Sequence, residues 1–254
     1  MKRIFIWHIL WLLLVGAVRA QDQTHFFIDT QGRAIEATIT ACDYSKNKVT
    51  LERAQDQRRV TVPINMFSRD DQAYIKEWYM SNELVSEKNL GINCRQQVLD
   101  RRKEEKVTDV TNSRGNYLGT DSQIKKYEKI GYEISLKNRG DLPLDKLRIE
   151  YRIYYEQSMQ GLNPEPEQKV FRGSVDVPSL GKGEKVSVKT DSVEIYDEEL
   201  SRDARISSSY TPVGGKGEVH GLRARIYLTL PGGKESMREF SEPSSLSEQR
   251  FTWE

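Results

Sequence analysis

The chain has 254 residues, of which 37% are apolar and 30% are charged. This length suits one or two domains with real cores, and the composition is not that of a disordered chain. Its formal charge is +1, from 39 basic and 38 acidic residues. So small a net charge excludes the broad basic surface that binds nucleic acids or anionic membranes, and we predict neither kind of partner.

Residues 1–20 have the three parts of a secretory signal peptide. Lys2 and Arg3 form a basic start, residues 4–18 an apolar run, and Val18 and Ala20 a small-residue cleavage site. The apolar run is shorter than the roughly 20 residues that a membrane-spanning helix needs. We therefore expect export to the periplasm, cell envelope or extracellular space, with no stable membrane span after cleavage. A retained anchor is the alternative.

Residues 21–80 predict a small β-barrel closed by a short helix. Phe26, Phe27 and Ile28 open a short strand. Alternating apolar and polar residues, which are typical of half-buried strands, then occur at residues 35–41, 49–51 and 60–62. Pro63 ends the last of these strands, because proline cannot donate to a strand ladder. Ser68 then predicts a helix start, with Asp71 close to a capping-box position. The apolar face of that helix comprises Ala73, Tyr74, Ile75 and Trp78.

This stretch also resembles a known family. Between residues 25 and 78 the chain has, in order, an aromatic-x-Asp-x-x-Gly start, Glu36-Ala37, KVTL, a Val-Pro strand end and SRDDQAYI. The order is similar to that of the Sla-homology domain, a Src-homology-three-like small barrel, in its bacterial exported version. The resemblance implies this fold and a peptide- or protein-binding role. Phe27 stands where the family usually has tryptophan, and we expect it in the core.

The resemblance also implies two ligand-binding residues. Members of the family that bind Asn-Pro-Phe-x-Asp peptides hold the acidic end of the peptide with basic residues on adjacent strands. These positions correspond to Arg53 and Arg59, and arginine suits the task because its guanidinium group matches a carboxylate in fork geometry. Strand parity offers an alternative, because it places Glu52 beside Arg59 as an opposite-charge cross-strand pair that needs no ligand.

Residues 81–125 predict a linker that includes a possible first strand of the next domain near residues 92–98. Apolar residues are few here, and the run at 100–106 mixes both charge signs, which indicates a solvated surface. Residues 112–120 are typical of a surface loop.

Residues 126–254 predict an immunoglobulin-like β-sandwich. Alternating apolar residues occur at 130–136, 147–155 and 222–230, with shorter strands near 175–177, 186–188, 193–195 and 237–240. Phe251 and Trp253 are expected to plug one end of its core. Tyr154 has outward parity beside Arg152, which predicts either a binding surface or a stabilising pair. The predicted fold class is all-β: a small barrel with a short C-terminal helix, a linker, then the sandwich.

The sequence offers few candidates for a catalytic or metal-binding motif. No nucleophile elbow, zinc-binding pair of histidines, Cys-x-x-Cys pair or phosphate loop is present, so we predict no enzyme, no cofactor and no metal. We expect His220 to be structural or exposed, and residues 197–199 to start a helix or form a solvated loop rather than bind a cation. Cys42 and Cys94 cannot form a disulfide framework; two thiols are favoured over one interdomain bridge.

These observations predict an exported, non-catalytic adaptor that binds a peptide or protein, with the barrel as binding module and the sandwich as spacer or second binding surface. The alternative is a structural, self-assembling component of the cell envelope. A hydrolase with an unrecognised site is a third hypothesis.

Overall fold

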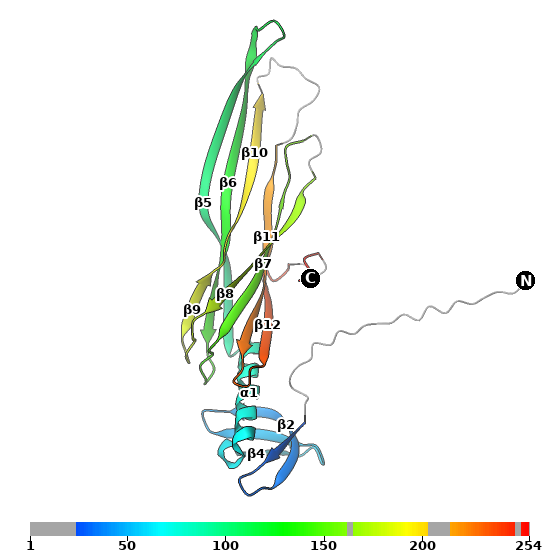
Figure 1. Cartoon of the computed structure of the whole chain (residues 1–254), viewed down its shortest axis with the longest axis vertical. Helices are drawn as coiled ribbons and strands as arrows, with labels where there is room; N and C mark the ends of the chain where they lie inside the picture. Colours follow the sequence, from blue (N-terminus) through cyan, green and yellow to red (C-terminus); the bar gives the residue numbers. More distant parts are fainter. Residues whose placement is uncertain (1–23, 162–164, 203–213, 247–249, 254) are drawn as a thin grey trace, which may run out of the picture. The chain divides into compact units, whose positions relative to one another are not determined.

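The computed structural model describes residues 24–161, 165–202, 214–246 and 250–253 (Figure 1). The predicted signal peptide lies outside the described residues. The described chain is mostly β, with one α-helix, as expected for an all-β fold. It divides into two compact units, Met1–Ile75 and Lys76–Glu254.

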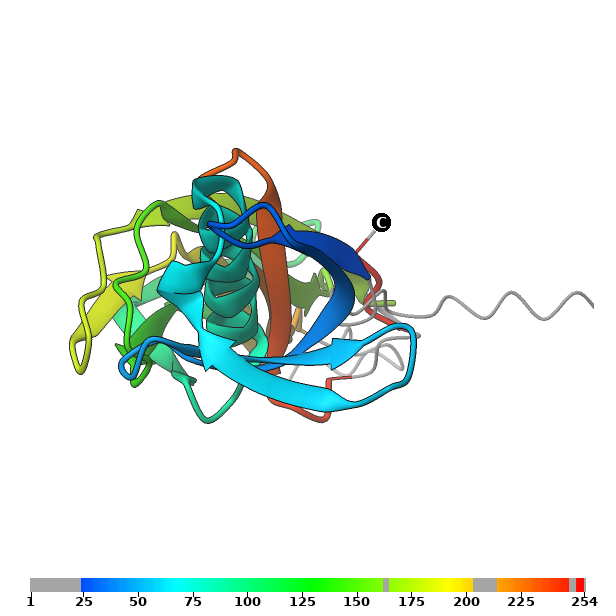
Figure 2. The same cartoon turned by 90° about the horizontal axis from the view of Figure 1, so that it is seen from below.

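The first unit is built on a four-stranded antiparallel sheet. Its strands follow one another in the order β1 (His25–Ile28), β2 (Ala34–Asp43), β3 (Lys48–Arg53) and β4 (Arg59–Pro63), close to the predicted positions. Figure 2 shows how strongly these blue and cyan strands curve. A single bridge joins Asp29 to Phe67, after the 3₁₀ turn η1 (Ile64–Met66). Within the described residues no pairing of β4 with β1 closes the sheet, so the barrel stays a prediction.

Helix α1 (Arg69–Val85) begins where Ser68 predicts. The Ser68 hydroxyl accepts a hydrogen bond from the Asp71 backbone N–H at 3.2 Å, and Asp71 accepts bonds from the Ile28 N–H and the Ser68 hydroxyl. Asp71 also contacts His25 at 2.7 Å. Burial works to raise the pKa of Asp71, but these hydrogen bonds outweigh it and lower the pKa. The helix start is therefore tied to β1.

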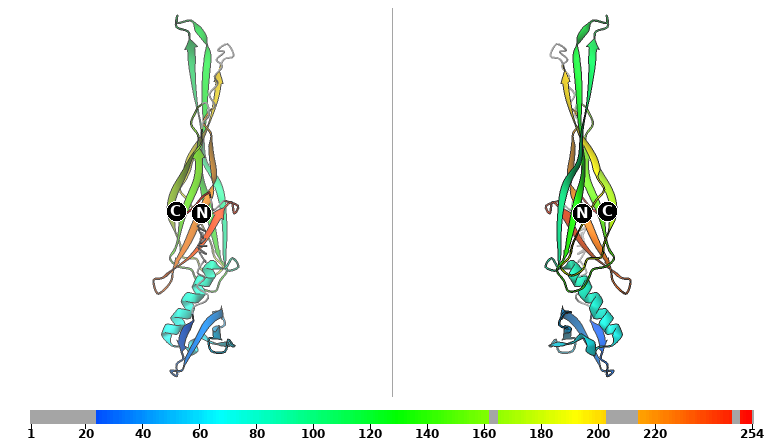
Figure 3. Two further views of the ribbon diagram at one scale, coloured as in Figure 1. Left: turned by 90° about the vertical axis from the view of Figure 1, so that its right-hand side faces the viewer. Right: turned by 90° about the vertical axis from the view of Figure 1, so that its left-hand side faces the viewer.

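The second unit contains two sheets. In the first, β6 (Tyr117–Asn138) pairs along one edge with β5 (Leu90–Thr111). Along its other edge it pairs with β9 (Lys185–Lys189) and then with β10 (Val193–Arg202). In Figure 3 the green β5 and β6 extend as a long ribbon beyond the strands of the second sheet.

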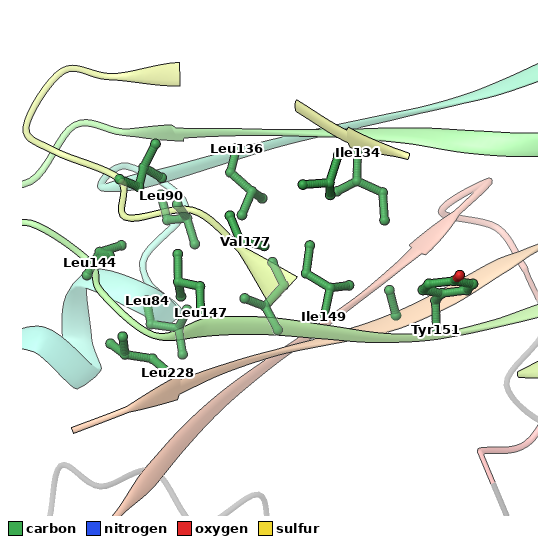
Figure 4. Close-up of a cluster of buried hydrophobic side chains, with 14 of the residues drawn as sticks. Leu84, Leu90, Ile134, Leu136, Leu144, Leu147, Ile149, Tyr151, Val177 and Leu228 are labelled. Atoms are coloured by element: carbon green, nitrogen blue, oxygen red, sulfur yellow. The ribbon is translucent and has the colours of Figure 1, made fainter. Parts of the chain in front are cut away.

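The second sheet has the order β12 (Glu235–Glu242), β11 (Gly217–Thr229), β7 (Leu147–Gln157) and β8 (Glu167–Val177). Side chains of both sheets meet in one hydrophobic core, to which α1 adds Met80 and Leu84 (Figure 4). Ile134 and Leu136 come from β6, while Leu147, Ile149 and Tyr151 come from β7. The shared core is what holds these two sheets together.

The region expected to be a linker differs from the prediction. Residues 81–125 contain the end of α1, all of β5 and the start of β6. Every residue of β5 from Val98 to Asp109 is exposed. Both faces of this part of the strand are therefore solvated, and the apolar alternation that indicates a half-buried strand is missing.

Candidate functional site

The two arginines predicted from the family resemblance do not converge on one site. The Arg59 Nε donates to Glu52 Oε2 at 2.8 Å, which is the cross-strand pair of the alternative interpretation. The Arg53 Nε donates to Asp56 Oδ1 at 2.9 Å. Successive strand side chains point to opposite faces, so Arg53 lies on the face opposite to that of Glu52 and Arg59. Each arginine therefore has its own carboxylate, on its own side of the sheet.

A denser group of arginines lies on the outer face of the second sheet, which we call the arginine face (Arg152, Arg172, Arg223 and Arg225). Arg152 of β7 stands opposite Arg172 of β8 on one side and opposite Arg223 of β11 on the other. Directly opposed residues of an antiparallel pair have Cβ atoms about 4.5–5.5 Å apart, and like charges there are destabilising. Three adjacent strands thus hold three guanidinium groups in a row.

The C-terminal segment covers part of this face. Tyr154, next to Arg152, is only 3% exposed, because it packs with Leu246 and Phe251. Its hydroxyl donates to the Thr252 carbonyl oxygen at 2.6 Å. Tyr154 thus has the outward parity that the sequence predicts, but the C-terminal segment covers it, so it is not an exposed binding surface. The expectation that Phe251 plugs one end of the core was wrong, since Phe251 lies on the outer face of the sheet and outside the shared core.

Trp253 lies between two of the arginines. The Cζ atoms of Arg152 and Arg225 lie 4.7 and 4.3 Å from the centre of its ring. Such cation–π contacts stabilise a guanidinium group without neutralising its charge. The chain also lies close to β11 where it leaves β12: a Cβ at Gly221 would approach the Glu242 carbonyl oxygen to 2.5 Å, and its φ of +154° disfavours other residues.

The arginines differ in how their charge is compensated. Arg223 is 8% exposed, donates to the Phe251 carbonyl oxygen at 2.7 Å and pairs with Glu239. Arg225 contacts the same carboxylate at 2.9 Å. Burial works to raise the pKa of Glu239, but Arg225 and Arg223 outweigh it and hold that pKa below its usual value. The positive charges of Arg223 and Arg225 are therefore compensated by the carboxylate of Glu239.

Arg152 and Arg172 have no carboxylate partner in the part of the chain that the structure describes. Burial lowers the pKa of the Arg152 guanidinium group, and the neighbouring charge of Arg172 lowers it further. Arg172 is exposed. A guanidinium group with a lowered pKa and no counter-ion is in an environment that would favour an anion.

A cavity of about 110 Å³ opens beside these two arginines. Among the described residues, its lining includes Arg152, Lys169, Arg172 and Arg250 and no carboxylate. Lys169 contacts Glu167 at 3.1 Å and Arg250 contacts Glu156 at 3.5 Å, both outside the lining. The cavity is large enough for a carboxylate or phosphate group, and a guanidinium fork binds either one in two-point fashion.

The other candidate groups have structural roles. His220 contacts Glu156 at 3.0 Å and packs against Phe251, as expected of a structural histidine. Residues 197–199 lie in β10 and not in a helix or loop; Glu198, for instance, accepts from the Gly215 N–H at 3.2 Å. No group of three or more possible metal ligands occurs among the described residues. Cys42 and Cys94 form no disulfide.

Sequence reasoning singled out Arg152 but not Arg172, Arg223 or Arg250. Arg152 and Arg223 occupy outward positions of predicted strands, which was a usable signal, whereas Arg172 precedes the strand predicted near residues 175–177. Their alignment in a row depends on the pairing of β8, β7 and β11, however, and no local pattern specifies that register.

Comparison with protein-family models and with curated proteins found no match. Among solved structures, the chain is similar to one described as the X-ray structure of Northeast Structural Genomics Consortium target SoR45. The identity is 7%, the alignment covers 61% of this chain and 86% of that one, and the TM-score is 0.24. So low a TM-score carries no argument. No helix in the described ranges has the length and apolar character needed to cross a membrane.

Proposed function

We propose that this chain is an exported, non-catalytic binding protein that recognises an acidic group of a peptide or protein ligand at the arginine face. The observation that carries the proposal is the row of Arg172, Arg152 and Arg223, two of which lack a carboxylate partner among the described residues. Residues 1–20, with the features of a signal peptide, support export.

The physical reason is the electrostatic cost of placing arginines opposite one another. Arg152 is half-buried and faces another arginine on each side, so an anion placed in the cavity relieves repulsion that the fold otherwise retains. Charge-assisted hydrogen bonds to guanidinium groups are roughly twice as strong as neutral ones. A ligand carboxylate therefore gains two-point contacts and removes a destabilising interaction of the free protein.

We propose that the first unit is a protein-binding module. Its four consecutive antiparallel strands and the helix capped by Ser68 are compatible with the Sla-homology barrel that the sequence resembles. The second unit, with two sheets around one core, is compatible with an immunoglobulin-like sandwich. In this arrangement the second unit is a binding surface in its own right and more than a spacer.

The test is thermal unfolding of the exported protein in inorganic phosphate and in chloride at equal ionic strength. Phosphate at 100 times its dissociation constant stabilises a binding protein by about 2.7 kcal/mol. We expect a higher melting temperature in phosphate, lost in the double variant Arg152→Gln, Arg172→Gln. Arg114→Gln removes an exposed arginine at the β5–β6 turn and is the matched control, which should retain the shift.

An equal effect of phosphate on the double variant and the wild type contradicts the proposal. Fluorescence titration with a short glutamate-rich peptide then asks whether the ligand is a carboxylate. Trp253 lies against Arg152, so its emission reports occupancy directly.

A second function, self-assembly, is favoured by a separate observation, the exposed edge of β5. The charges along the β5 edge indicate which strand would pair with it.

A further inference from the structure

The far half of β5 is an edge strand with no partner on one side. Among the described residues β5 pairs only with β6, and every side chain from Val98 to Asp109 is exposed. Figure 3 shows the ribbon of β5 and β6 extending beyond the strands of the second sheet. An edge of this kind presents a row of unpaired backbone N–H and C=O groups, which form a template for another strand.

The charges along this edge are complementary to themselves when the strand is reversed. Residues 100–106 read Asp-Arg-Arg-Lys-Glu-Glu-Lys. If two copies of β5 pair antiparallel with Lys103 opposite Lys103, Asp100 faces Lys106, Arg101 faces Glu105 and Arg102 faces Glu104. Two-fold symmetry repeats each pair. Every position except the central lysine therefore meets an opposite charge.

Other registers lack this property. A shift by one residue in one direction places Arg102 opposite Lys103 and Asp100 opposite Glu105. The opposite shift places Arg101 opposite Lys106. Parallel pairing in register sets every charge against its own kind. Like charges directly opposite one another are destabilising, so a single register is selected.

We propose that two copies of this chain associate edge to edge through β5, in antiparallel pairing centred on Lys103. The proposal is independent of the arginine face, because none of its residues belongs to the second sheet. The occupant of the edge is thus a second copy of the chain, held by backbone hydrogen bonds and six opposite-charge pairs.

Charged residues on an edge strand often serve to keep other strands away. A strand that only had to repel its own copies would do so best with one charge sign, whereas this one alternates blocks of opposite sign about a centre. Leu99 and Val107, 48% and 58% exposed, flank the charged run, and the same register brings them together across the two copies. The apolar residues on either side of the charged run therefore favour the same register as the charges.

The contacts that these side chains make within one chain do not prevent the pairing. Arg101 contacts Glu128 at 2.9 Å and Lys103 contacts Glu105 at 3.3 Å, all at exposed side chains, where ion pairs are weak. Arg102 contacts Glu194 at 3.0 Å. A guanidinium group has five N–H donors, so Arg102 can keep Glu194 and still reach Glu104 of the second copy.

Sedimentation velocity of the exported protein over a range of concentrations tests the proposal. We expect a dimer at high concentration that dissociates as salt rises, because exposed charge pairs are screened. The variant Arg101→Glu, Arg102→Glu turns four opposite pairs into like pairs. Its dissociation constant should rise about ten- to a hundredfold. The reciprocal variant Glu104→Arg, Glu105→Arg should behave alike.

Mixing the two variants separates lost pairing from misfolding. In the proposed register all the reversed residues of one variant face opposite charges of the other, so an equimolar mixture should form a heterodimer at least as stable as the wild-type dimer. The matched control, Lys126→Glu with Lys129→Glu, makes the same charge change on the neighbouring strand β6 and should leave dimerisation near the wild-type level.

Cross-linking tests the register. Lys103→Cys places two thiols opposite each other at the two-fold axis, and we expect a 103–103 disulfide in peptide maps. Asp100→Cys should not cross-link to itself, since the two positions would lie about 20 Å apart. A strictly monomeric wild type, a mixture that fails to associate, or cross-linking at position 100 in place of 103 overturns the proposal.

Discussion

Replacing Glu83 by glutamine should stabilise the second unit at neutral pH. Glu83 lies in α1 and is 3% exposed. Its Oε1 accepts a hydrogen bond from the Asn89 amide at 3.0 Å, while its Oε2 is buried without a hydrogen-bond partner among the described residues. Burial raises the pKa of Glu83 and the nearby Asp141 raises it further, although the Tyr79 hydroxyl opposes the shift. The folded protein therefore favours the neutral carboxyl.

The sign of the pH dependence follows from this shift. In the unfolded chain Glu83 ionises near the ordinary glutamate pKa of 4.5, but in the folded protein it ionises only at higher pH. Its contribution to stability is fully present below the unfolded pKa and is lost as pH rises through the folded pKa. The pH-dependent cost arises from the buried negative charge, which glutamine lacks. Glu83→Gln should therefore gain stability at pH 7 to 8, by about 1.4 kcal/mol for each pH unit by which the pKa is raised, and almost none at pH 4.

Urea unfolding between pH 4 and pH 9 measures the difference. Trp78 and Trp253 both lie in the second unit, so their fluorescence reports its unfolding. Glu87→Gln, four residues further along at an exposed position, controls for the loss of one charge and should change little. A stability difference between Glu83→Gln and wild type that is constant across this pH range would refute the reasoning.

Three further predictions concern the first unit and the C-terminal segment. Asp71→Asn should destabilise the first unit by about 1–2 kcal/mol, because it weakens the hydrogen bonds that tie α1 to β1. Since the pKa of Asp71 is lowered, this contribution is present above the unfolded value of 3.8 and is lost as pH falls below it, which urea unfolding followed by circular dichroism will show. Tyr154→Phe removes the hydroxyl that holds the C-terminal segment and should cost about 0.5–1.5 kcal/mol, with earlier proteolysis near Trp253; unchanged proteolysis would count against the contact. Arg53 and Arg59 lie on opposite faces of the small sheet. On a peptide array, at most one of the variants Arg53→Glu and Arg59→Glu should therefore weaken the binding of any given peptide. Strong coupling between the two in a double-mutant cycle would contradict that geometry.

Where a strand buries one face, its residues could be predicted from the sequence. In β7, Leu147, Ile149, Tyr151 and Ile153 alternate with polar residues, and all four are buried in the shared core. The start of α1 could be predicted as well, because Ser68 and Asp71 act through bonds between near neighbours. Local patterns report local structure and the boundary between water and core, and these two features are largely local.

The features that were missed depend on contacts between distant residues. Nothing in residues 98–109 indicates a strand, since its pairing with β6 rests on backbone hydrogen bonds and not on an apolar face. Tyr154 has outward parity, and only the return of Phe251, far along the chain, buries it. The row of arginines exists only once β8, β7 and β11 are in register. In each case the sequence shows which side chain is present, but not which distant residue lies beside it in the fold.

Both proposed surfaces are formed by outward polar residues of strands, and this coincidence has a physical basis. A core residue is constrained by packing, so its identity carries little information about ligands. An outward residue is free of that constraint, and a costly choice there needs another explanation. Arginine opposite arginine across β7 and β8 is costly, and so is a long unpaired edge in β5. In the two proposals, an anion removes the first cost and a second copy of the chain removes the second. The two can therefore be tested separately, because at constant ionic strength an anion should leave dimerisation unchanged, and charge reversal in β5 should leave anion binding unchanged.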